Sequence, residues 1–298
     1  MLKRTLFFGS PGKLSIQNSL LTWESTDNPV KKISLEDIAF IVLESQQILI
    51  STYCLNAIAE NGIALICCDN SHLPSAQMIP FSNNSLTQKH TAAQLNASDA
   101  LKGRLWRQTI QAKILNQAQC LANFGFQNMR LLALHKEVKN NDVNNTEAVA
   151  ARYYFQQLSN QQNNFLRERN GIPPNHALNY GYAIIRAAVA RALTSSGLLC
   201  VVGIHHANQY NPLGLADDIM EPYRPFIDAL VFSNISFFDC ERLEKEHKAE
   251  LLRALTMDVK IANENRPLLN AISFTTASLA RCFLKEQNTV IYPEFPSL

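Results

Sequence analysis

Two short runs of the sequence gather histidine and carboxylate side chains at spacings that could hold a cation. The first is residues 203–206, and the second is residues 215–225. In the second run, Asp218 and Asp217 lie three and four residues before Glu221, so either pair can share one helix face. Stacked like charges repel each other, which favours a solvated face or a bound cation. Carboxylates with imidazole suit Mn²⁺ or Mg²⁺, ions that support phosphoryl chemistry.

A third acid, Glu147, follows two residues typical of a helix start, Asn145 and Thr146. The helix dipole favours an acid in a first turn, so Glu147 has an ordinary structural explanation. Taken alone, the residue does not distinguish that explanation from a catalytic role.

These motifs and their order along the chain resemble those of one known family. Residues 203–206 and 215–225 are similar to the Gly-x-x-His and Leu-Ala-x-Asp-x-x-Glu-Pro-Tyr-Arg-Pro signature of the Cas1 family, the CRISPR-associated spacer-acquisition integrases and endonucleases. Residues 145–155 resemble the family's Glu-Ala-x-x-Ala-x-x-Tyr/Phe-Phe helix. Residues 4–8 and 67–76 resemble the N-terminal domain of the variety found in type II systems. The resemblance extends over essentially the whole chain.

The resemblance implies that Glu147, His206 and Glu221 are catalytic and hold Mg²⁺ or Mn²⁺. His206, not His205, follows the glycine at the family's spacing. His205 is then a neighbour, either a DNA contact or a loop residue. Asp218, one helical turn before Glu221, would hold a metal-bound water or the histidine.

Other polar residues near these motifs have simpler explanations. Asp217 is most simply a solvated or capping acid. Arg224 can pair with Glu221 or with Asp228, and we favour such a pair over a phosphate contact because flanking prolines keep the segment local. The long polar spacer 207–214 leaves the loop geometry open.

Charge is unevenly distributed along the chain. The net charge is +2, and residues 1–80 carry five basic and seven acidic side chains against 22 and 18 in the rest. Residues 101–140 carry seven Lys or Arg and one acid, which could be a phosphate-facing stripe or a solvated helix face. The candidate DNA contacts are Lys102, Arg104, Arg107, Arg167, Arg169, Arg186, Arg191 and Arg224.

The 298 residues, 47% of them apolar, can form one large or two ordinary domains. Short apolar runs up to residue 80 predict strands, interrupted by one helix that Ser51 caps and that Asn61-Gly62 ends. Residues 71–84 contain two prolines and predict an exit loop. Helical periodicity follows from about His90, with a helix starting at Asn175 or Asn179 and ending at Gly197. Two later helices are expected, over 242–255 and 268–285.

The fold class is therefore α+β, with a β-sandwich-like N-terminal domain followed by an all-helical catalytic domain. The expected boundaries are 1–80 for the first domain, 81–90 for a linker and 91–298 for the second domain. The resemblance further implies a homodimer assembled through the β domains.

The implied activity is insertion of short DNA duplexes into a CRISPR repeat array by 3′-hydroxyl attack. The implied partners are double-stranded and branched DNA and a small ferredoxin-like protein in a heterohexameric complex. A branched-DNA repair nuclease and a DNA-binding scaffold with a vestigial metal site are the alternatives. Seven cysteines without a Cys-x-x-Cys pattern, and apolar runs too short for a signal peptide or membrane helix, predict a cytoplasmic protein with no membrane partner.

Overall fold

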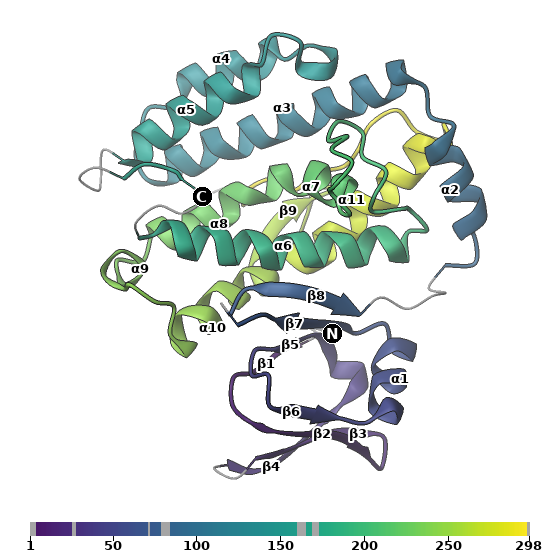
Figure 1. Cartoon of the computed structure of the whole chain (residues 1–298). Coiled ribbons are helices and arrows are strands. Elements are labelled where there is room, and N and C mark those ends of the chain that lie inside the picture. The colour runs from purple at the N-terminus through teal and green to yellow at the C-terminus, as the bar shows by residue number, and fades with distance from the viewer. Residues whose placement is uncertain are drawn as a thin grey trace. The chain divides into compact units, whose positions relative to one another are not determined.

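Two units make up the chain, residues 1–83 and residues 84–298 (Figure 1). The computed structural model describes residues 4–25, 28–70, 72–78, 84–159, 165–168 and 173–296. Within these ranges, no helix is both long and apolar enough to cross a membrane.

The first unit contains two four-stranded sheets and one helix. Their bounds are Arg4–Phe8 (β1), Gly12–Gln17 (β2), Leu20–Ser25 (β3), Asn28–Ser34 (β4), Ile38–Leu43 (β5), Ile48–Ile50 (β6), Thr52–Glu60 (α1), Ala64–Cys68 (β7) and Pro74–Met78 (β8). The strand orders are β1-β5-β7-β8 and β4-β3-β2-β6. Every residue of β5 is buried, as its continuous apolar run predicts for a central strand. Leu14 and Trp23 of one sheet share a core with Ile41 and Leu65 of the other.

The helix in this unit has the predicted ends. The Ser51 hydroxyl accepts a hydrogen bond from the Cys54 amide at 3.2 Å, and Gly62 follows the C-cap Asn61 with a positive φ of 63°. The expected exit loop is wrong in part, because Pro74–Met78 forms β8 at the edge of a sheet. Its pairing with β7 comes from backbone hydrogen bonds, which the side-chain pattern of this polar segment does not indicate.

Helices dominate the second unit. They are Thr87–Leu95 (α2), Asp99–Asn123 (α3), Met129–Glu137 (α4), Thr146–Ser159 (α5), Asn175–Ser195 (α6), Gly214–Met220 (α7), Arg224–Phe232 (α8), Ser236–Asp239 (α9), Lys245–Arg253 (α10) and Leu268–Phe283 (α11). The long helix α3 packs against α4 and α5 and also against α7 and α8 (Figure 1). Helix α6 begins at Asn175 and ends before Gly197, whose φ is 72°.

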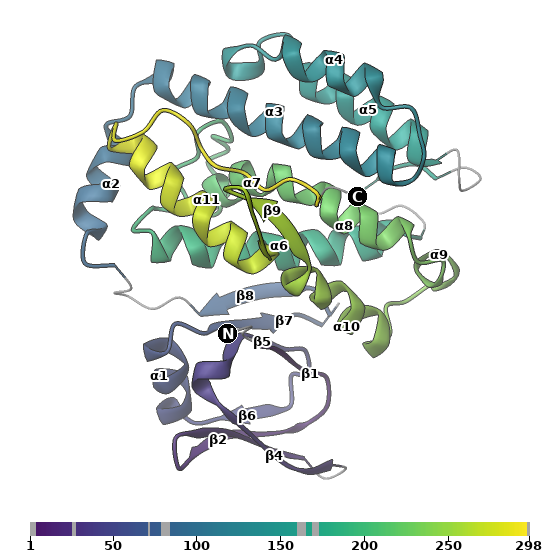
Figure 2. The ribbon, with the colours of Figure 1, turned by 180° about the vertical axis from the view of Figure 1, so that it is seen from behind.

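Two expectations for this part of the chain need correction. Helix α2 begins at Thr87, inside the expected linker 81–90. The unit also contains an antiparallel hairpin, Asp258–Ile261 (β9) with Glu264–Pro267 (β10), so it is not all helical. Ala262 and Asn263 between these strands have φ values of 50° and 65°, the turn geometry that two-residue hairpins favour. Helix α11 packs against this hairpin and α6 (Figure 2).

Candidate active site

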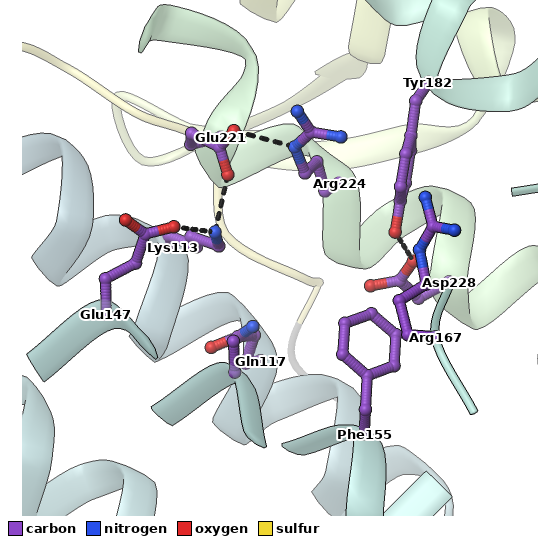
Figure 3. Close-up of a pocket in the computed structure, with 10 residues that line it drawn as sticks. Lys113, Gln117, Glu147, Phe155, Arg167, Tyr182, Glu221, Arg224 and Asp228 are labelled. Atoms are coloured by element: carbon purple, nitrogen blue, oxygen red, sulfur yellow. Dashed lines mark hydrogen bonds and ion pairs between the residues drawn. The ribbon is translucent and has the colours of Figure 1, made fainter. Parts of the chain in front are cut away.

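Two of the three predicted catalytic residues, both of them acids, meet at one buried ammonium group. Lys113 Nζ on α3 lies 2.5 Å from Glu147 Oε1 on α5 and 2.5 Å from Glu221 Oε2 (Figure 3). Glu221 begins a single 3-10 turn, Glu221–Tyr223 (η3), between α7 and α8. Three elements that are distant in sequence therefore place two carboxylates around one cation.

The charges of this cluster are closely balanced. Arg224 Nε donates to Glu221 Oε1 at 2.8 Å, which is the local pair favoured by the sequence. Burial acts to raise the pKa of Glu221, but the positive charges of Arg224 and Lys113 outweigh burial and lower the pKa to about 2. Burial acts to lower the pKa of Lys113, yet Glu221 and Glu147 hold it above its usual value. Glu221 is thus anionic when the site is formed.

Glu147 is positioned by a cap that the sequence does not indicate. Asp142, which is 8% exposed, accepts hydrogen bonds from the amides of Thr146 and Glu147, each at 2.9 Å. It lies in the 3-10 turn Asn140–Asp142 (η2), and it satisfies two of the free amides at the start of α5. The cap is therefore Asp142 and not Asn145, which we had expected from the sequence.

A buried carboxylate organises the histidine loop. Asp218 on α7, fully buried, accepts hydrogen bonds from the amides of Ile204, His205 and His206, and His206 Nδ1 donates to its Oδ1 at 2.6 Å. A Cβ at Gly203 would lie 2.5 Å from the His206 carbonyl oxygen and 2.8 Å from Asp218 Oδ2. Only glycine fits there, which gives the Gly-x-x-His spacing a physical basis.

Asp218 was expected to hold either a metal-bound water or the histidine. In the structure, its carboxylate holds the ring of His206. This hydrogen bond raises the pKa of His206. It also assigns the Nδ1 proton to the bond with Asp218 in the neutral ring, leaving the Nε2 lone pair available as a metal ligand.

The neighbouring histidine has a different environment. His205 stacks on Trp106 of α3, with ring centroids 4.2 Å apart and planes 2° apart. Trp106 also meets the edge of His206 at 5.7 Å. The indole therefore fixes both rings, and His205 packs against it while its backbone amide bonds to Asp218.

A cavity of about 190 Å³ opens beside the carboxylate pair. Its residues are Lys113, Gln117, Glu147, Ala151, Phe155, Arg167, Tyr182, Glu221, Arg224 and Asp228 (Figure 3). The far end is aromatic and cationic, because Arg167 and Arg224 lie 5.3 Å and 4.6 Å from the centre of the Tyr182 ring. Asp228 accepts hydrogen bonds from Tyr182 and Tyr154. Among the described residues, Arg224 donates to Glu221 and not to Asp228.

His206 does not line this cavity, although its pKa responds to the charge of Glu221. Among the described residues, no three His, Cys, Asp or Glu side chains are arranged to hold a metal ion as they stand. The donors nevertheless fit a divalent cation in kind. Two carboxylates already surround a cation, and the nearby imidazole is oriented by a carboxylate, as metal-binding histidines usually are.

The candidate DNA contacts occupy varied surroundings. Arg104 is exposed on α3, whereas Lys102 and Arg107 are half-buried there. Arg186 binds Asp217 at 2.6 Å and 2.9 Å, so that acid is paired and not simply solvated or capping. Burial lowers the pKa of Arg191. Arg167 donates to Asn175 and Asn179 at 2.8 Å each, and Arg169 lies outside the described residues.

Sequence reasoning missed several residues of the site. The sequence places Lys113 in a basic stripe, but the side chain is buried between the two glutamates. Gln117 lies one helical turn further along α3, and Tyr182 comes from α6. Lys113 and Gln117 are four residues apart, which places them on one helix face. This spacing is the only feature of the sequence that groups the two residues.

Comparisons with known proteins agree with this fold. A family model described as "CRISPR associated protein Cas1" matches residues 6–252. A relative from Neisseria meningitidis serogroup C (strain 8013), named "CRISPR-associated endonuclease Cas1", is 38% identical over 284 residues, which cover 93% of this chain and 91% of the relative.

Two solved structures share the fold at low sequence identity. A chain described as "Casposase bound to integration product" superposes with a TM-score of 0.80 at 19% identity, covering 97% of this chain and 92% of that chain. A chain of a "Cas6-RT-Cas1--Cas2 complex" has a TM-score of 0.74 at 20% identity, covering 97% of this chain and 36% of that chain.

Proposed function

Because this chain belongs to the Cas1 family of CRISPR-associated proteins, we propose that it is a DNA integrase and endonuclease that installs short foreign duplexes as new spacers in a CRISPR repeat array. One observation carries the proposal. Glu147 and Glu221, from separate elements, share one buried cation beside a cavity, and the charge of Glu221 acts on His206, whose ring Asp218 orients. The name of the relative at 38% identity and the fold of the casposase chain support the same function.

In this proposal, Glu147, His206 and Glu221 hold a Mg²⁺ or Mn²⁺ ion. When bound, the ion would supply Lewis-acid stabilisation of the charge that develops on the scissile phosphate. Asp218 keeps the His206 ring oriented through its Nδ1 hydrogen bond. Arg224 donates to the Glu221 oxygen that Lys113 does not contact, so it neutralises the carboxylate and keeps it fixed.

The chemistry would be strand transfer. The 3′-hydroxyl of an incoming duplex attacks a phosphodiester of the repeat, and one such attack at each end joins the new spacer. The cationic side chains in and beside the cavity, Lys113, Arg167 and Arg224, would offset phosphate charge there. We further propose a homodimer acting on DNA in the cytoplasm together with a small ferredoxin-like partner in a heterohexamer, since one structural neighbour belongs to a complex named for Cas1 and Cas2.

An integration assay tests the proposal. It would use fluorescent short duplexes, a plasmid that carries the repeat, Mn²⁺ or Mg²⁺, and the purified partner. We expect Glu147→Ala, His206→Ala and Glu221→Ala each to abolish strand transfer while the protein stays folded, because each removes a metal donor. His205→Ala is the matched control and should be milder. Wild-type rates in any of the three variants would show that the site is misassigned.

A further inference from the structure

Helix α3 holds Glu221 at two points. Lys113 contacts its carboxylate. Asn116, three residues later on the same helix face, donates through Nδ2 to the carbonyl oxygen of Pro222, the next residue, at 2.7 Å. Asn116 is fully buried, and it does not line the cavity beside the glutamates. It therefore acts on the backbone next to Glu221 and not on a ligand in the cavity.

The same amide group also binds a later segment of the chain, residues 287–296. Asn116 Nδ2 donates to the carbonyl oxygen of Pro293 at 3.0 Å. This segment runs along α3 (Figure 2), where the side chains of Gln108 and Gln119 bond to its backbone near either end. Asn116 thus ties the turn η3 to a segment that is itself fastened along the helix.

A second buried side chain makes a similar bridge from α11. The hydroxyl of Thr275 donates to the carbonyl oxygen of Ile291 at 2.7 Å, so its one proton is used there. Tyr223 must then donate the hydrogen bond that joins its hydroxyl to Thr275 at 2.6 Å. Thr275 and Tyr223 are both fully buried. The two residues that follow Glu221 are therefore each connected to segment 287–296 by one buried polar side chain.

We propose that Asn116 is a positioning residue for Glu221, and that it works with Thr275 to hold η3 in the orientation from which the carboxylate binds a metal ion. This inference rests on the proposed function. A single 3-10 turn has few hydrogen bonds of its own, so contacts from outside decide its orientation. Fully satisfied buried hydrogen bonds make such a geometry rigid. Asn116 and Thr275 supply these bonds from α3 and α11.

The test measures Mn²⁺ affinity by calorimetry, in the full chain and without DNA. Asn116→Leu keeps the approximate size of the side chain and removes both hydrogen bonds, so we expect it to weaken Mn²⁺ binding by about 10- to 100-fold. Gln119→Leu is the matched control, because it removes a bond from α3 to segment 287–296 and Gln119 has no described bond to η3. Its affinity should equal that of wild type. Tyr223→Phe loses one hydrogen bond of the second bridge and should weaken binding by about 2- to 10-fold.

Strand transfer at increasing Mn²⁺ concentration separates positioning from a direct chemical role. Asn116→Leu should need at least about 10-fold more Mn²⁺ for half of its maximal rate, yet recover most of the wild-type rate at saturation, because Glu221 is still present. Glu221→Ala should stay inactive at every Mn²⁺ concentration. A substitution that only destabilised the fold would lower the amount of active protein and leave the Mn²⁺ requirement unchanged.

Hydrogen exchange of the metal-free protein tests the turn itself. The amides of Glu221 and Arg224 bond to the carbonyl oxygens of Asp218 and Glu221. Relative to amides of α6, their exchange should accelerate by about 10-fold or more in Asn116→Leu but not in Gln119→Leu. A wild-type protein that binds no Mn²⁺ would refute the proposed metal site, while these exchange rates would still decide whether Asn116 holds η3.

Three results overturn the inference. The first is unchanged exchange at η3 in Asn116→Leu. The second is wild-type Mn²⁺ affinity in Asn116→Leu when the wild-type protein does bind Mn²⁺. The third is an equal loss of affinity in Gln119→Leu, which would mean that any loosening of segment 287–296 has the same effect. If Asn116→Leu does not fold, Tyr223→Phe decides by the same measurements, and unchanged exchange or affinity in that variant overturns the inference.

Discussion

At the scale of single residues, Lys113 determines the charge state of the site. Its ammonium balances one of the two glutamates, and Arg224 balances the other. A divalent ion added to this cluster leaves two excess positive charges. A DNA phosphate near the cavity would offset that excess, so metal and DNA should each favour binding of the other.

Lys113→Met should weaken the metal-free fold and strengthen metal binding. Removing one partner of a buried ion pair leaves a carboxylate uncompensated, at a cost of about 3 kcal/mol. The same change removes a competing cation, so Mn²⁺ affinity should rise by at least about tenfold. Thermal unfolding without metal and calorimetric titration with Mn²⁺ measure the two effects.

Lys136→Met is the control for this substitution, because Lys136 is exposed on α4 and should change neither quantity. Unchanged stability in Lys113→Met, or a weaker affinity for Mn²⁺, would mean that the ammonium does not hold Glu147 and Glu221 together.

Asp228 should make stability fall as the pH rises from about 4 to about 6. Burial raises the pKa of Asp228 from 3.8 to about 6, although hydrogen bonds from Tyr182 and Tyr154 act to lower it. A carboxyl with a raised folded-state pKa binds more protons in the folded than in the unfolded protein between these values. Its contribution is therefore fully present below about pH 4 and lost as the pH passes 6.

Comparison with Asp228→Asn isolates this effect. The free energy of unfolding of wild type relative to the variant should fall by up to about 3 kcal/mol between pH 4 and pH 6, as measured by urea denaturation. Parallel pH profiles for the two proteins would show that Asp228 is already ionised at pH 4.

At the scale of elements, the site depends on how the ends of helices are formed. Glu147 is in the first turn of α5, and the turn before it holds Asn141, Asp142 and Asn145 in left-handed conformations, with φ values of 60°, 47° and 52°. Asn and Asp tolerate that region better than most residues do. The chain can therefore turn back so that the Asp142 carboxylate reaches the amide of Glu147.

Asp142→Ala should destabilise the second unit by about 1–2 kcal/mol and loosen Glu147. The substitution leaves two helix amides, one buried and one partly buried, without their acceptor. A drop of roughly 2–6 °C in melting temperature would follow. Asp142→Asn, which keeps one oxygen acceptor, should fall between Ala and wild type. An unchanged melting temperature for Asp142→Ala would mean that water caps the helix equally well.

The elements also show how far the sequence predicts this structure. The run Ile38–Leu43 and the helix after Ser51 follow from apolar periodicity and capping, which are local properties, and the structure has both. Strand β8 and the β9–β10 hairpin form through pairing between backbones, and little in their own side chains indicates it.

The site shows the same difference between features that local sequence pattern predicts and features that depend on contacts between distant segments. The resemblance selected Glu147, His206 and Glu221, and the acids of this set meet at Lys113. The sequence shows Lys113 only as one of several basic residues on a helix, because its burial depends on α5 and η3, which supply Glu147 and Glu221 and lie far away in the sequence. Local pattern could not distinguish it from exposed Arg104 on the same helix.

At the scale of the whole molecule, the two units differ in charge. The first 83 residues carry five basic and seven acidic side chains, and the remaining residues carry 22 and 18. Lys113 is buried, so the basic side chains of α3 that remain open to phosphate contacts are Lys102, Arg104 and Arg107. DNA binding should therefore depend on the second unit and on phosphate contacts that carry no base identity.

Changing Lys102, Arg104 and Arg107 together to Ala should flatten the salt dependence of duplex binding. A protein that neutralises Z phosphates loses affinity with salt at a slope of about −0.9Z on logarithmic axes, so the slope should change by up to roughly three units. Affinity should fall about equally for unrelated sequences. Fluorescence titrations from low to moderate salt measure the slope.

The first unit supplies a control with the same loss of charge. Lys13, Lys31 and Lys32 are exposed there, and changing all three to Ala also removes three positive charges from the chain. If DNA responds only to overall charge, both triple variants should show the same small loss. If the α3 side chains contact phosphates, only their removal should flatten the slope, because counterion release requires contact. An unchanged slope in the α3 variant would move the DNA path to other arginines of the second unit.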